Sequence, residues 1–187
     1  MVLLWQTHKT ALWYLGIVLI MTGCRPYTRG VTQPMGIDRL LQNDNQVEIV
    51  VKLADAIFAK ESHVGFVGLT PAEQTFWCIY WLQAEVDNGG FHQYFFNSAG
   101  DCAQDVVRAL EVIGAPQTVT LVREAMSIFP SGVAPRDRVQ RQEELSEVED
   151  QASEKLDDLD NRFYESPDDL FVLLVQYIRE HRGEFSL

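Results

Sequence analysis

The sequence predicts an all-α protein, and three observations support this class. From residue 44 onward, apolar residues recur at spacings of three and four, which places them on one face of an α-helix. No alternating run of β-branched residues in this region is long enough to predict a strand. The 187 residues are 47% apolar and 22% charged, a composition that suits one compact domain. We expect roughly six to eight helices from this pattern.

The first two expected helices differ in how their apolar residues are arranged. The first is marked by an apolar face made of Val47, Val50, Val51, Ala54 and Phe58. The second begins with a capping box, in which Thr70 accepts a hydrogen bond from the Glu73 amide and Pro71 takes the first helical position. Apolar residues then lie on nearly every side, which predicts a central place in a helical bundle. They are Phe76, Trp77, Ile79, Tyr80 and Leu82.

The later helices are recognised by their ends. Asp101 is expected to cap a helix that stops at Gly114, and Pro116 is expected to open the next one. Residues 166–169, Ser-Pro-Asp-Asp, are typical of the start of a final helix. Basic residues near position 180 then meet the negative end of that helix before Gly183.

The first 24 residues have the layout of an export signal. Lys9 is their only formal positive charge, residues 11–21 carry no charge, and Thr22 and Gly23 precede Cys24. The uncharged run would span about 16 Å of helix, well short of a bilayer core of roughly 30 Å, so a permanent membrane span is disfavoured. The Met-Thr-Gly-Cys ending resembles a bacterial lipoprotein signal, which implies lipidation of Cys24.

This interpretation divides the chain into three parts. Residues 1–23 are the predicted signal peptide, residues 24–43 the anchor cysteine and a flexible tether, and residues 44–187 the helical domain. The predicted location is the bacterial cell envelope, with the lipid as the membrane contact. The alternative is that translation begins at Met35 and that the protein stays in the cytoplasm.

Charge is concentrated in one segment. The chain has 27 acidic and 15 basic residues, a formal net charge of −12, which disfavours direct binding to nucleic acid and favours a basic protein partner. Residues 143–169 hold twelve acidic residues and two basic ones, and their apolar residues again recur at three and four. The candidate acidic binding face is Glu143, Glu144, Glu147, Asp150, Glu154, Asp157 and Asp158. The alternative is an ordinary solvated helix face.

The stretch EVDNGGFHQYFFNSAGD, residues 85–101, crowds carboxylates, a His and two Asn around a Gly pair. Catalysis or metal binding would need convergent groups, but Glu85 and Asp87 face apart on a helix and His92 lacks a second His four residues away. We therefore assign no catalytic, cofactor-binding or metal-binding residues, and an enzyme using this stretch is the third hypothesis.

The structural interpretation of this stretch is a junction between helices. Asn88, Gly89 and Gly90 are suited to end one helix and to begin another at an angle. The aromatic residues Phe91, Tyr94 and Phe95 then form one apolar face. We expect Asn88 and Asn97 to hydrogen-bond helix ends, and Glu85, Gln93 and Asp101 to satisfy backbone amides.

The core NGGF-x-QYF-x-NS-x-GD closely resembles the signature of a bacterial family named for a DNA-mimic protein. The resemblance extends over roughly residues 69–185 and includes FPSGVAPRDRVQRQEEL and LDDLDNRFYES. It implies an all-helical fold and, for the characterised member, a dimer whose surface carboxylates imitate phosphates and occupy a transcription factor's DNA site. The family-motif residues are Glu85, Asn88, Gly89, Gly90, Phe91, Gln93, Tyr94, Phe95, Asn97, Ser98, Gly100 and Asp101.

Two functional hypotheses follow. The first is a noncatalytic acidic interaction module, displayed on a membrane through Cys24, with a basic protein as partner and no cofactor. The alternative is a cytoplasmic DNA mimic that occupies the DNA site of a basic DNA-binding protein. The resemblance implies a homodimer in either case. An envelope location would permit a disulfide between Cys78 and Cys102, whereas the apolar surroundings of Cys78 favour two buried free thiols.

Overall fold

The computed structural model describes residues 36–186, and within that range it contains helices and no strand, so the predicted all-α class is confirmed. The seven α-helices are α2 (Ile37–Leu40), α3 (Gln46–Val64), α4 (Pro71–Phe96), α5 (Ala103–Ile113), α6 (Pro116–Met126), α7 (Arg138–Tyr164) and α8 (Leu170–Glu180). Two short 3₁₀ helices lie between them, η1 (Phe66–Gly68) and η2 (Ser98–Cys102), and a third, η3 (Arg182–Glu184), follows α8. None of these helices is long and apolar enough to span a bilayer. The predicted signal peptide and Cys24 lie outside the described residues.

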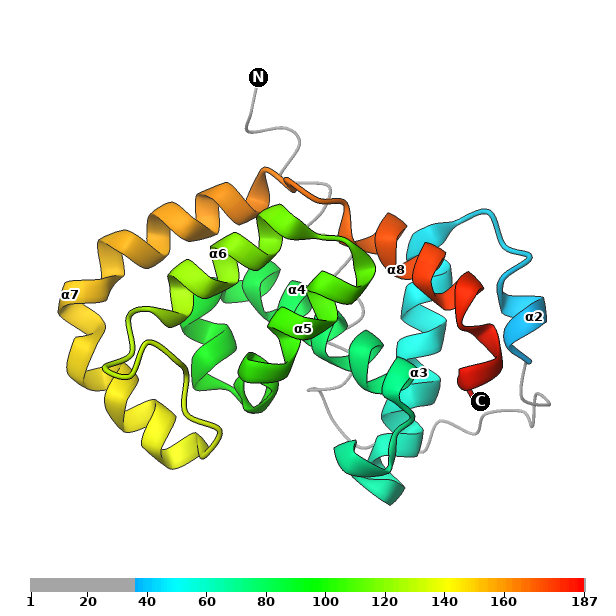
Figure 1. Ribbon diagram of the computed structural model, residues 1–187, viewed down its shortest axis with the longest axis horizontal. Helices are drawn as coiled ribbons and strands as arrows, with labels where there is room; N and C mark the ends of the chain where they lie inside the picture. The colour runs from blue at the N-terminus through cyan, green and yellow to red at the C-terminus, as the bar shows by residue number, and fades with distance from the viewer. Residues whose placement is uncertain (1–35, 187) are drawn as a thin grey trace, which may run out of the picture. The chain divides into compact units, whose positions relative to one another are not determined.

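Helix α4 runs through the centre of the described domain (Figure 1). Its first half packs against α3, where Phe58 meets Trp77 and Trp81 at ring-centroid distances of 5.7 Å. Its second half packs against α7, where Phe91 meets Phe163 edge-on at 5.7 Å. Helix α5 packs against α4, α6 packs against α5 and α7, and α8 lies beside α3. Because α4 is buried on most sides, it carries the apolar residues that the sequence predicts for a central helix.

Helix α3 buries a different face from the one that its spacing predicted. Val50 and Ala54 are buried as expected, but Val47 and Phe58 are each 46% exposed and Val51 is also exposed. The core face consists of Ile49, Val50, Leu53, Ala54 and Ile57. This helix is apolar on two sides, so a three-and-four spacing can be drawn through either side, and only the tertiary packing decides between them.

The helical fold begins within the segment that the sequence assigned to the tether. Leu40 and Leu41 belong to the hydrophobic core, although both precede the predicted boundary at residue 44. Asn45 then starts α3 by accepting a hydrogen bond from the Glu48 amide at 3.2 Å. Residues from Ile37 onward are therefore part of the packed domain.

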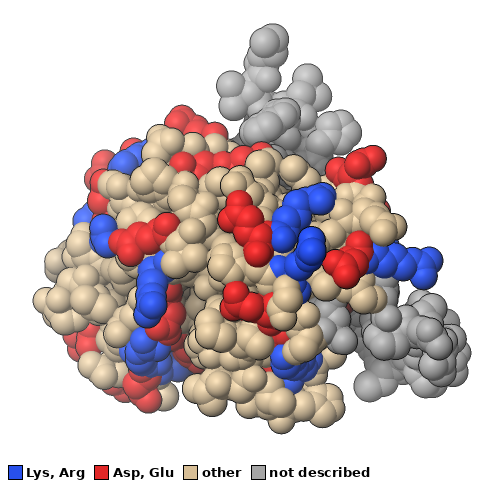
Figure 2. Space-filling view, turned by 45° about the vertical axis from the view of Figure 1, so that its right-hand side comes forward, with Lys and Arg blue, Asp and Glu red and all other residues tan. Residues whose placement is uncertain are grey.

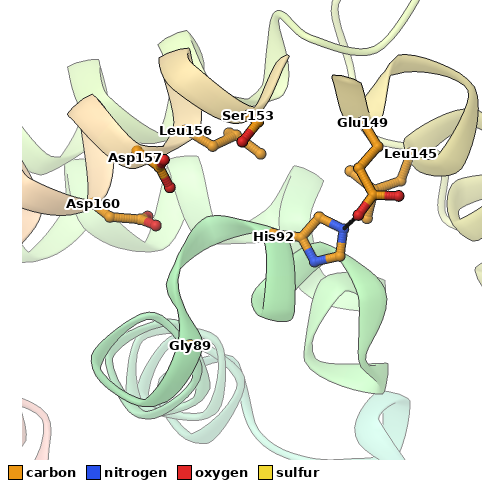
Figure 3. Close-up of a pocket in the computed structure, with 8 residues that line it drawn as sticks. All are labelled: Gly89, His92, Leu145, Glu149, Ser153, Leu156, Asp157 and Asp160. Atoms are coloured by element: carbon orange, nitrogen blue, oxygen red, sulfur yellow. Dashed lines mark ion pairs between the residues drawn. The ribbon is translucent and has the colours of Figure 1, made fainter. Parts of the chain in front are cut away.

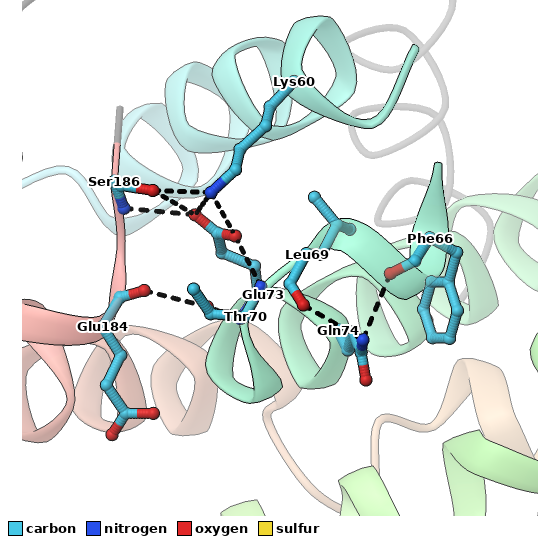
Figure 4. A network of polar contacts seen from close by, with 8 residues as sticks. All are labelled: Lys60, Phe66, Leu69, Thr70, Glu73, Gln74, Glu184 and Ser186. Atoms are coloured by element: carbon cyan, nitrogen blue, oxygen red, sulfur yellow. Dashed lines mark hydrogen bonds and ion pairs between the residues drawn. The ribbon is translucent and has the colours of Figure 1, made fainter. Parts of the chain in front are cut away.

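The start of α4 is held by more than its predicted capping box. Thr70 and Glu73 make both bonds of the box, at 3.2 and 2.9 Å. The fully buried Glu73 carboxylate also binds Lys60 Nζ at 2.7 Å and accepts from the Ser186 amide at 3.1 Å (Figure 4). Burial opposes ionisation of Glu73, but the hydrogen bonds from Lys60, Thr70 and Ser186 outweigh it and hold its pKa below its usual value. The C-terminal tail is thereby fastened to the first turn of α4.

The other helix ends agree with the sequence at three of four positions. Gly114 ends α5 with a φ of 78°, Pro116 is the first residue of α6, and Asp169 caps α8 by accepting from the Val172 amide at 3.1 Å. The prediction for Asp101 is wrong, because α5 begins at Ala103 without a side-chain cap. Asp101 instead binds an arginine from α7, which belongs to the candidate site described below.

Candidate functional site

The Gly pair breaks α4 into two helical halves. Gly89 has φ −161° and ψ 27°, and Gly90 has φ 75° and ψ −177°, so neither continues the helix. The conformation of Gly90 belongs to a region that only glycine occupies without strain. The chain therefore turns at the place that the Asn-Gly-Gly sequence predicts, and the second half runs on as far as Phe96.

Polar side chains bridge the two halves of α4. Glu85, in the first half, accepts hydrogen bonds from Gln93 Nε2 at 2.6 Å and from Asn97 Nδ2 at 2.8 Å. The sequence predicted that Glu85 and Gln93 satisfy backbone amides, and that Asn97 caps a helix end with its side chain. The structure pairs these side chains with one another, because the break brings residues eight and twelve positions apart onto one side of the junction.

The backbone amide freed by the break is capped from another helix. Asp160 of α7 accepts a hydrogen bond from the Phe91 amide at 2.8 Å. A Cβ atom added to Gly90 would lie 2.0 Å from Asp160 Oδ2, so the absence of a side chain is what allows this approach. Burial raises the pKa of Asp160, and the neighbouring Asp157 raises it further, against the opposing effects of the Phe91 amide and His92.

A buried arginine fixes the far end of the second half. Arg141 of α7 is fully buried and donates from Nε to the Phe95 carbonyl at 2.6 Å. Its Nη2 donates to the Asn97 carbonyl at 3.1 Å and to Asp101 Oδ1 at 2.6 Å. Its Nη1 donates to the carbonyls of Pro135 and Arg136. The guanidinium thus satisfies carbonyl groups that a helix end leaves unpaired, which a planar five-donor group does well.

These contacts give most residues of the motif a structural role. Phe91, Tyr94 and Phe95 are completely buried, and a Cβ on Gly100 would lie 2.7 Å from Arg141 Nε and 2.9 Å from two backbone oxygens. Asn88 and Ser98 are exposed. Sequence reasoning missed Arg141 and Asp160. One signal was available for Arg141, since it lies four residues before Leu145 on the apolar face of its helix.

The outer face of α7 presents a single row of carboxylates. Their spacing alternates between four and three residues, so they follow one line along the helix, and all five side chains are exposed: Glu143, Glu147, Asp150, Glu154 and Asp157. Among residues 36–186, none of these five carboxylates lies in an ion pair. We call this set the acidic row.

Elsewhere in the described domain, acidic side chains frequently have basic neighbours. On the face shown in Figure 2, Lys and Arg side chains are interspersed with Asp and Glu. Ion pairs outside the acidic row include Glu48 with Lys52, Asp105 with Arg136, Glu111 with Arg123, and Glu124 with Arg162. The acidic row therefore combines a regular spacing with carboxylates that form no ion pair within the described residues.

The dimensions of the acidic row fit a short piece of a nucleic-acid strand. Neighbouring carboxylates are separated by about 5 Å along the helix axis, and the whole row by about 21 Å, at 1.5 Å per residue. One strand of duplex DNA carries roughly six phosphates over that length, at 3.4 Å each. Five carboxylates over the same length give a comparable linear density of negative charge.

Comparison with known protein families adds the decisive observation. The family described as "DMP19-like protein" matches residues 68–181, which is more than half of the chain. This chain belongs to the DMP19-like family. The matched range contains the broken α4 helix, both α7 residues that hold it, and the whole acidic row. Searches of curated proteins and of solved structures each gave no match.

Two residues of the predicted acidic face, Glu144 and Asp158, already contact other side chains of this DMP19-like domain. Glu144 is half-buried, and its Oε1 accepts from Gln140 Nε2 at 2.8 Å. Asp158 lies 3.5 Å from Arg162, which also binds Glu124 at 2.7 Å. A partner would have to compete with these intramolecular contacts, so the five residues of the acidic row are better placed to bind it.

The enzyme hypothesis requires the side chains of the 85–101 stretch to converge, but each of them contacts a different partner in this DMP19-like domain. Glu85 binds Gln93 and Asn97, Asp101 binds Arg141, and His92 Nε2 lies 3.8 Å from Glu149 Oε1. His92 lines a pocket of about 210 Å³ between the break in α4 and α7, with Glu149 on one side and Asp157 and Asp160 on the other (Figure 3). Within residues 36–186, no group of three His, Cys, Asp or Glu side chains is arranged to hold a metal ion.

Proposed function

We propose that this DMP19-like chain is a noncatalytic interaction protein that presents the acidic row in place of a DNA phosphate strand and so occupies the DNA site of a basic DNA-binding protein. The acidic row carries the proposal, because it is regular in spacing, exposed, and without an ion-pair partner among residues 36–186. Membership of a family named for a DNA mimic supports the proposal.

The affinity of an acidic surface for a basic partner depends on which existing contacts the partner must displace. An acidic side chain that already holds an arginine gives up that contact when a partner's arginine replaces it, so the net gain is small. The carboxylates of the acidic row make no such contact with described residues, and each new charge-assisted hydrogen bond therefore adds to the affinity. The same charges accelerate encounter with a basic surface, and both effects weaken as salt rises.

Capture followed by charge reversal tests the proposal. The chain would be immobilised, a bacterial lysate passed over it, and the retained protein identified, purified and titrated against the chain. We expect a DNA-binding protein whose affinity for the chain falls roughly tenfold or more when ionic strength is raised from 50 to 200 mM. Reversing three charges of the acidic row, Glu147→Lys, Asp150→Lys and Glu154→Lys, should abolish binding.

A matched variant controls for net charge. Asp44→Lys, Asp55→Lys and Glu180→Lys change the net charge by the same amount at exposed positions outside α7. This control should reduce binding only slightly. Equal binding by the wild type and the acidic-row variant would overturn the proposal, and so would equal loss in both triple variants, which would indicate a nonspecific effect of net charge.

A second candidate places the same domain in the cell envelope. The observation that favours it is the sequence of residues 1–24, with its uncharged run and its Gly-Cys ending. A lipid on Cys24 would separate the acidic row from chromosomal proteins, and its partner would then be a basic envelope protein or a cationic peptide. Palmitate labelling of the full chain and of Cys24→Ala, carried out in parallel, distinguishes the envelope protein from the DNA mimic. Labelling that the substitution removes favours the envelope protein. An unlabelled soluble protein favours the DNA mimic.

A further inference from the structure

The pocket between the break in α4 and helix α7 combines carboxylates with an apolar wall. Glu149, Asp157 and Asp160 line it, and Figure 3 shows Glu149 on one side and the two aspartates on the other. Leu145 and Leu156 line it as well, and both of these side chains are buried. Its volume of about 210 Å³ is below the roughly 300 Å³ at which pockets for drug-sized ligands begin, so the space suits one amino-acid side chain.

The basic side chains of α7 leave the charge of this pocket unbalanced. Among residues 36–186, no lysine or arginine lines it. The nearest basic residues along α7, Lys155 and Arg162, face α6 instead. Lys155 donates to Ser127 Oγ at 2.7 Å, and Arg162 donates to Glu124 Oε2 at 2.7 Å. The three carboxylates of the pocket are therefore accessible to a cation from outside the domain.

The arrangement of these carboxylates favours one kind of cation. Within residues 36–186, no group of three His, Cys, Asp or Glu side chains is placed to hold a metal ion. An ammonium group is a compact point charge, whereas a guanidinium is planar and spreads five donors, so it can bond to acceptors on two sides at once. The methylene stem of an arginine can also pack on the leucine wall. Burial raises the pKa of Asp160 and Asp157 raises it further, and a cation beside Asp160 offsets both effects.

We propose that this pocket takes the guanidinium of an arginine side chain that the basic partner inserts beside the acidic row. Asp157 belongs to both features, since it lines the pocket and is the last carboxylate of the acidic row. A partner that lies along the acidic row therefore reaches the pocket, where one inserted arginine anchors it. The ligand is then the same basic protein as in the proposed function, on which this inference rests.

Titration of the full-length chain with an arginine analogue tests the pocket without the partner. The probe is N-acetyl-arginine amide, whose only charge is the guanidinium, and its uncharged counterpart is N-acetyl-citrulline amide. Binding would be followed through the ring resonances of His92, which lines the pocket, with those of His63 and His181 on other elements as references. We expect saturable shifts of His92 with a Kd in the millimolar range for the arginine probe, and none for the citrulline probe.

A double neutralisation separates the pocket from the acidic row. Glu149→Gln with Asp160→Asn removes two charges from the pocket, leaves the acidic row intact and keeps an acceptor for the Phe91 amide. The control, Asp44→Asn with Asp55→Asn, makes the same change in net charge at exposed positions outside α7. We expect the pocket variant to weaken binding of the probe and of the captured partner by about tenfold each, and the control to bind both as the wild type does.

The acidic-row triple variant distinguishes the pocket from the proposed function. None of its three substituted residues lines the pocket, so it should still bind the arginine probe while it loses the partner. Equal shifts of His92 with the arginine and citrulline probes, or none with either, would overturn the inference. So would a pocket variant that loses the probe but keeps the full affinity for the partner. Neither result touches the proposed function, which fails instead if the triple variant keeps the partner.

Discussion

Helix α7 has two charged faces, and they differ in how many partners their charges hold. On the inner face, Arg141 makes five hydrogen bonds and Asp160 caps the second half of α4. On the outer face, the five carboxylates of the acidic row have no ion-pair partner among the described residues. The inner face therefore accounts for the architecture of the family motif, and the outer face is where a binding function can reside.

The difference has a simple physical origin. A buried charge or polar group must find partners, because leaving it unpaired costs several kcal/mol, so Arg141 and Asp160 are constrained by the fold. An exposed carboxylate is solvated whether or not it has a partner, so the fold constrains it little. Substitutions on the inner face should consequently change stability, and substitutions on the outer face should change binding.

The largest effect is expected at Arg141. Arg141→Ala removes five donors from a buried site and leaves Phe95, Asn97 and Asp101 without them, so we expect a loss of about 3–5 kcal/mol in the free energy of unfolding. Arg141→Lys should recover little of this loss, since an ammonium cannot reproduce the planar fork. Urea unfolding followed by circular dichroism measures both. The exposed Arg138→Ala is the control, and an equal midpoint for Arg141→Ala and Arg138→Ala would refute the role of Arg141.

The second largest effect separates the two glycines of the motif. Gly90→Ala places a Cβ 2.0 Å from Asp160 Oδ2 in a backbone conformation that disfavours side chains, so we expect a loss of about 2–4 kcal/mol. Gly89→Ala meets mainly the flexible end of Gln93, at 2.2 Å, and should cost about 1 kcal/mol or less. Thermal unfolding of both variants tests the distinction. Equal Tm values would mean that the close approach of α7 does not determine the need for glycine at position 90.

A smaller and pH-dependent effect is expected at Asp160. Asp160→Ala removes the cap of the Phe91 amide and should cost about 1–2 kcal/mol, whereas Asp160→Asn keeps an acceptor and should cost much less. The pKa of Asp160 is raised in the folded state, so between its unfolded and folded pKa values the folded chain binds more protons. Its contribution to stability is therefore greatest at low pH and declines as pH rises through that window.

Unfolding of wild type and Asp160→Asn at several pH values between 3 and 7 measures this contribution. The stability of the wild type relative to Asp160→Asn should fall as pH rises and then become constant. A relative stability that rises with pH would show that the Phe91 amide dominates over burial and would contradict the direction of the pKa shift.

The smallest effect on stability is expected on the outer face. The triple charge reversal in the acidic row should change the free energy of unfolding by no more than about 0.5 kcal/mol per site, because these side chains are exposed. The three substituted positions are consecutive in the acidic row, so repulsion among three lysines replaces repulsion among three carboxylates, while the contacts with Glu143 and Asp157 at its two ends change from repulsion to attraction. Differential scanning fluorimetry checks this expectation before any binding assay. A Tm drop comparable with that of Arg141→Ala would mean that the outer face also supports the fold.

Features within one short stretch of chain could be predicted from the sequence. The capping box of Thr70 and Glu73, the break at the Gly pair, and the end of α5 at Gly114 all depend on residues a few positions apart. Local spacing also identified the acidic segment and its solvent-facing carboxylates. The all-α class followed from the same spacing.

Features that join distant parts of the chain could not be predicted in this way. The contacts of Arg141 with Phe95, of Asp160 with Phe91, and of Ser186 with Glu73 span 46, 69 and 113 residues. The wrong assignment of Asp101 as a helix cap has the same cause, since a local role was assumed for a side chain that binds α7. The buried face of α3 was mistaken because two faces are apolar and the choice is made by α4 and α8.

Competition with DNA tests whether the acidic row occupies the DNA site of its partner. The DNA-binding protein that the chain captures would be titrated with a fluorescent duplex carrying its site, in the presence of the wild-type chain or of the acidic-row triple variant. We expect that the wild type displaces the duplex completely, that no ternary complex forms, and that the triple variant displaces nothing. A stable ternary complex, or displacement by the triple variant at the same concentration as the wild type, would contradict this expectation.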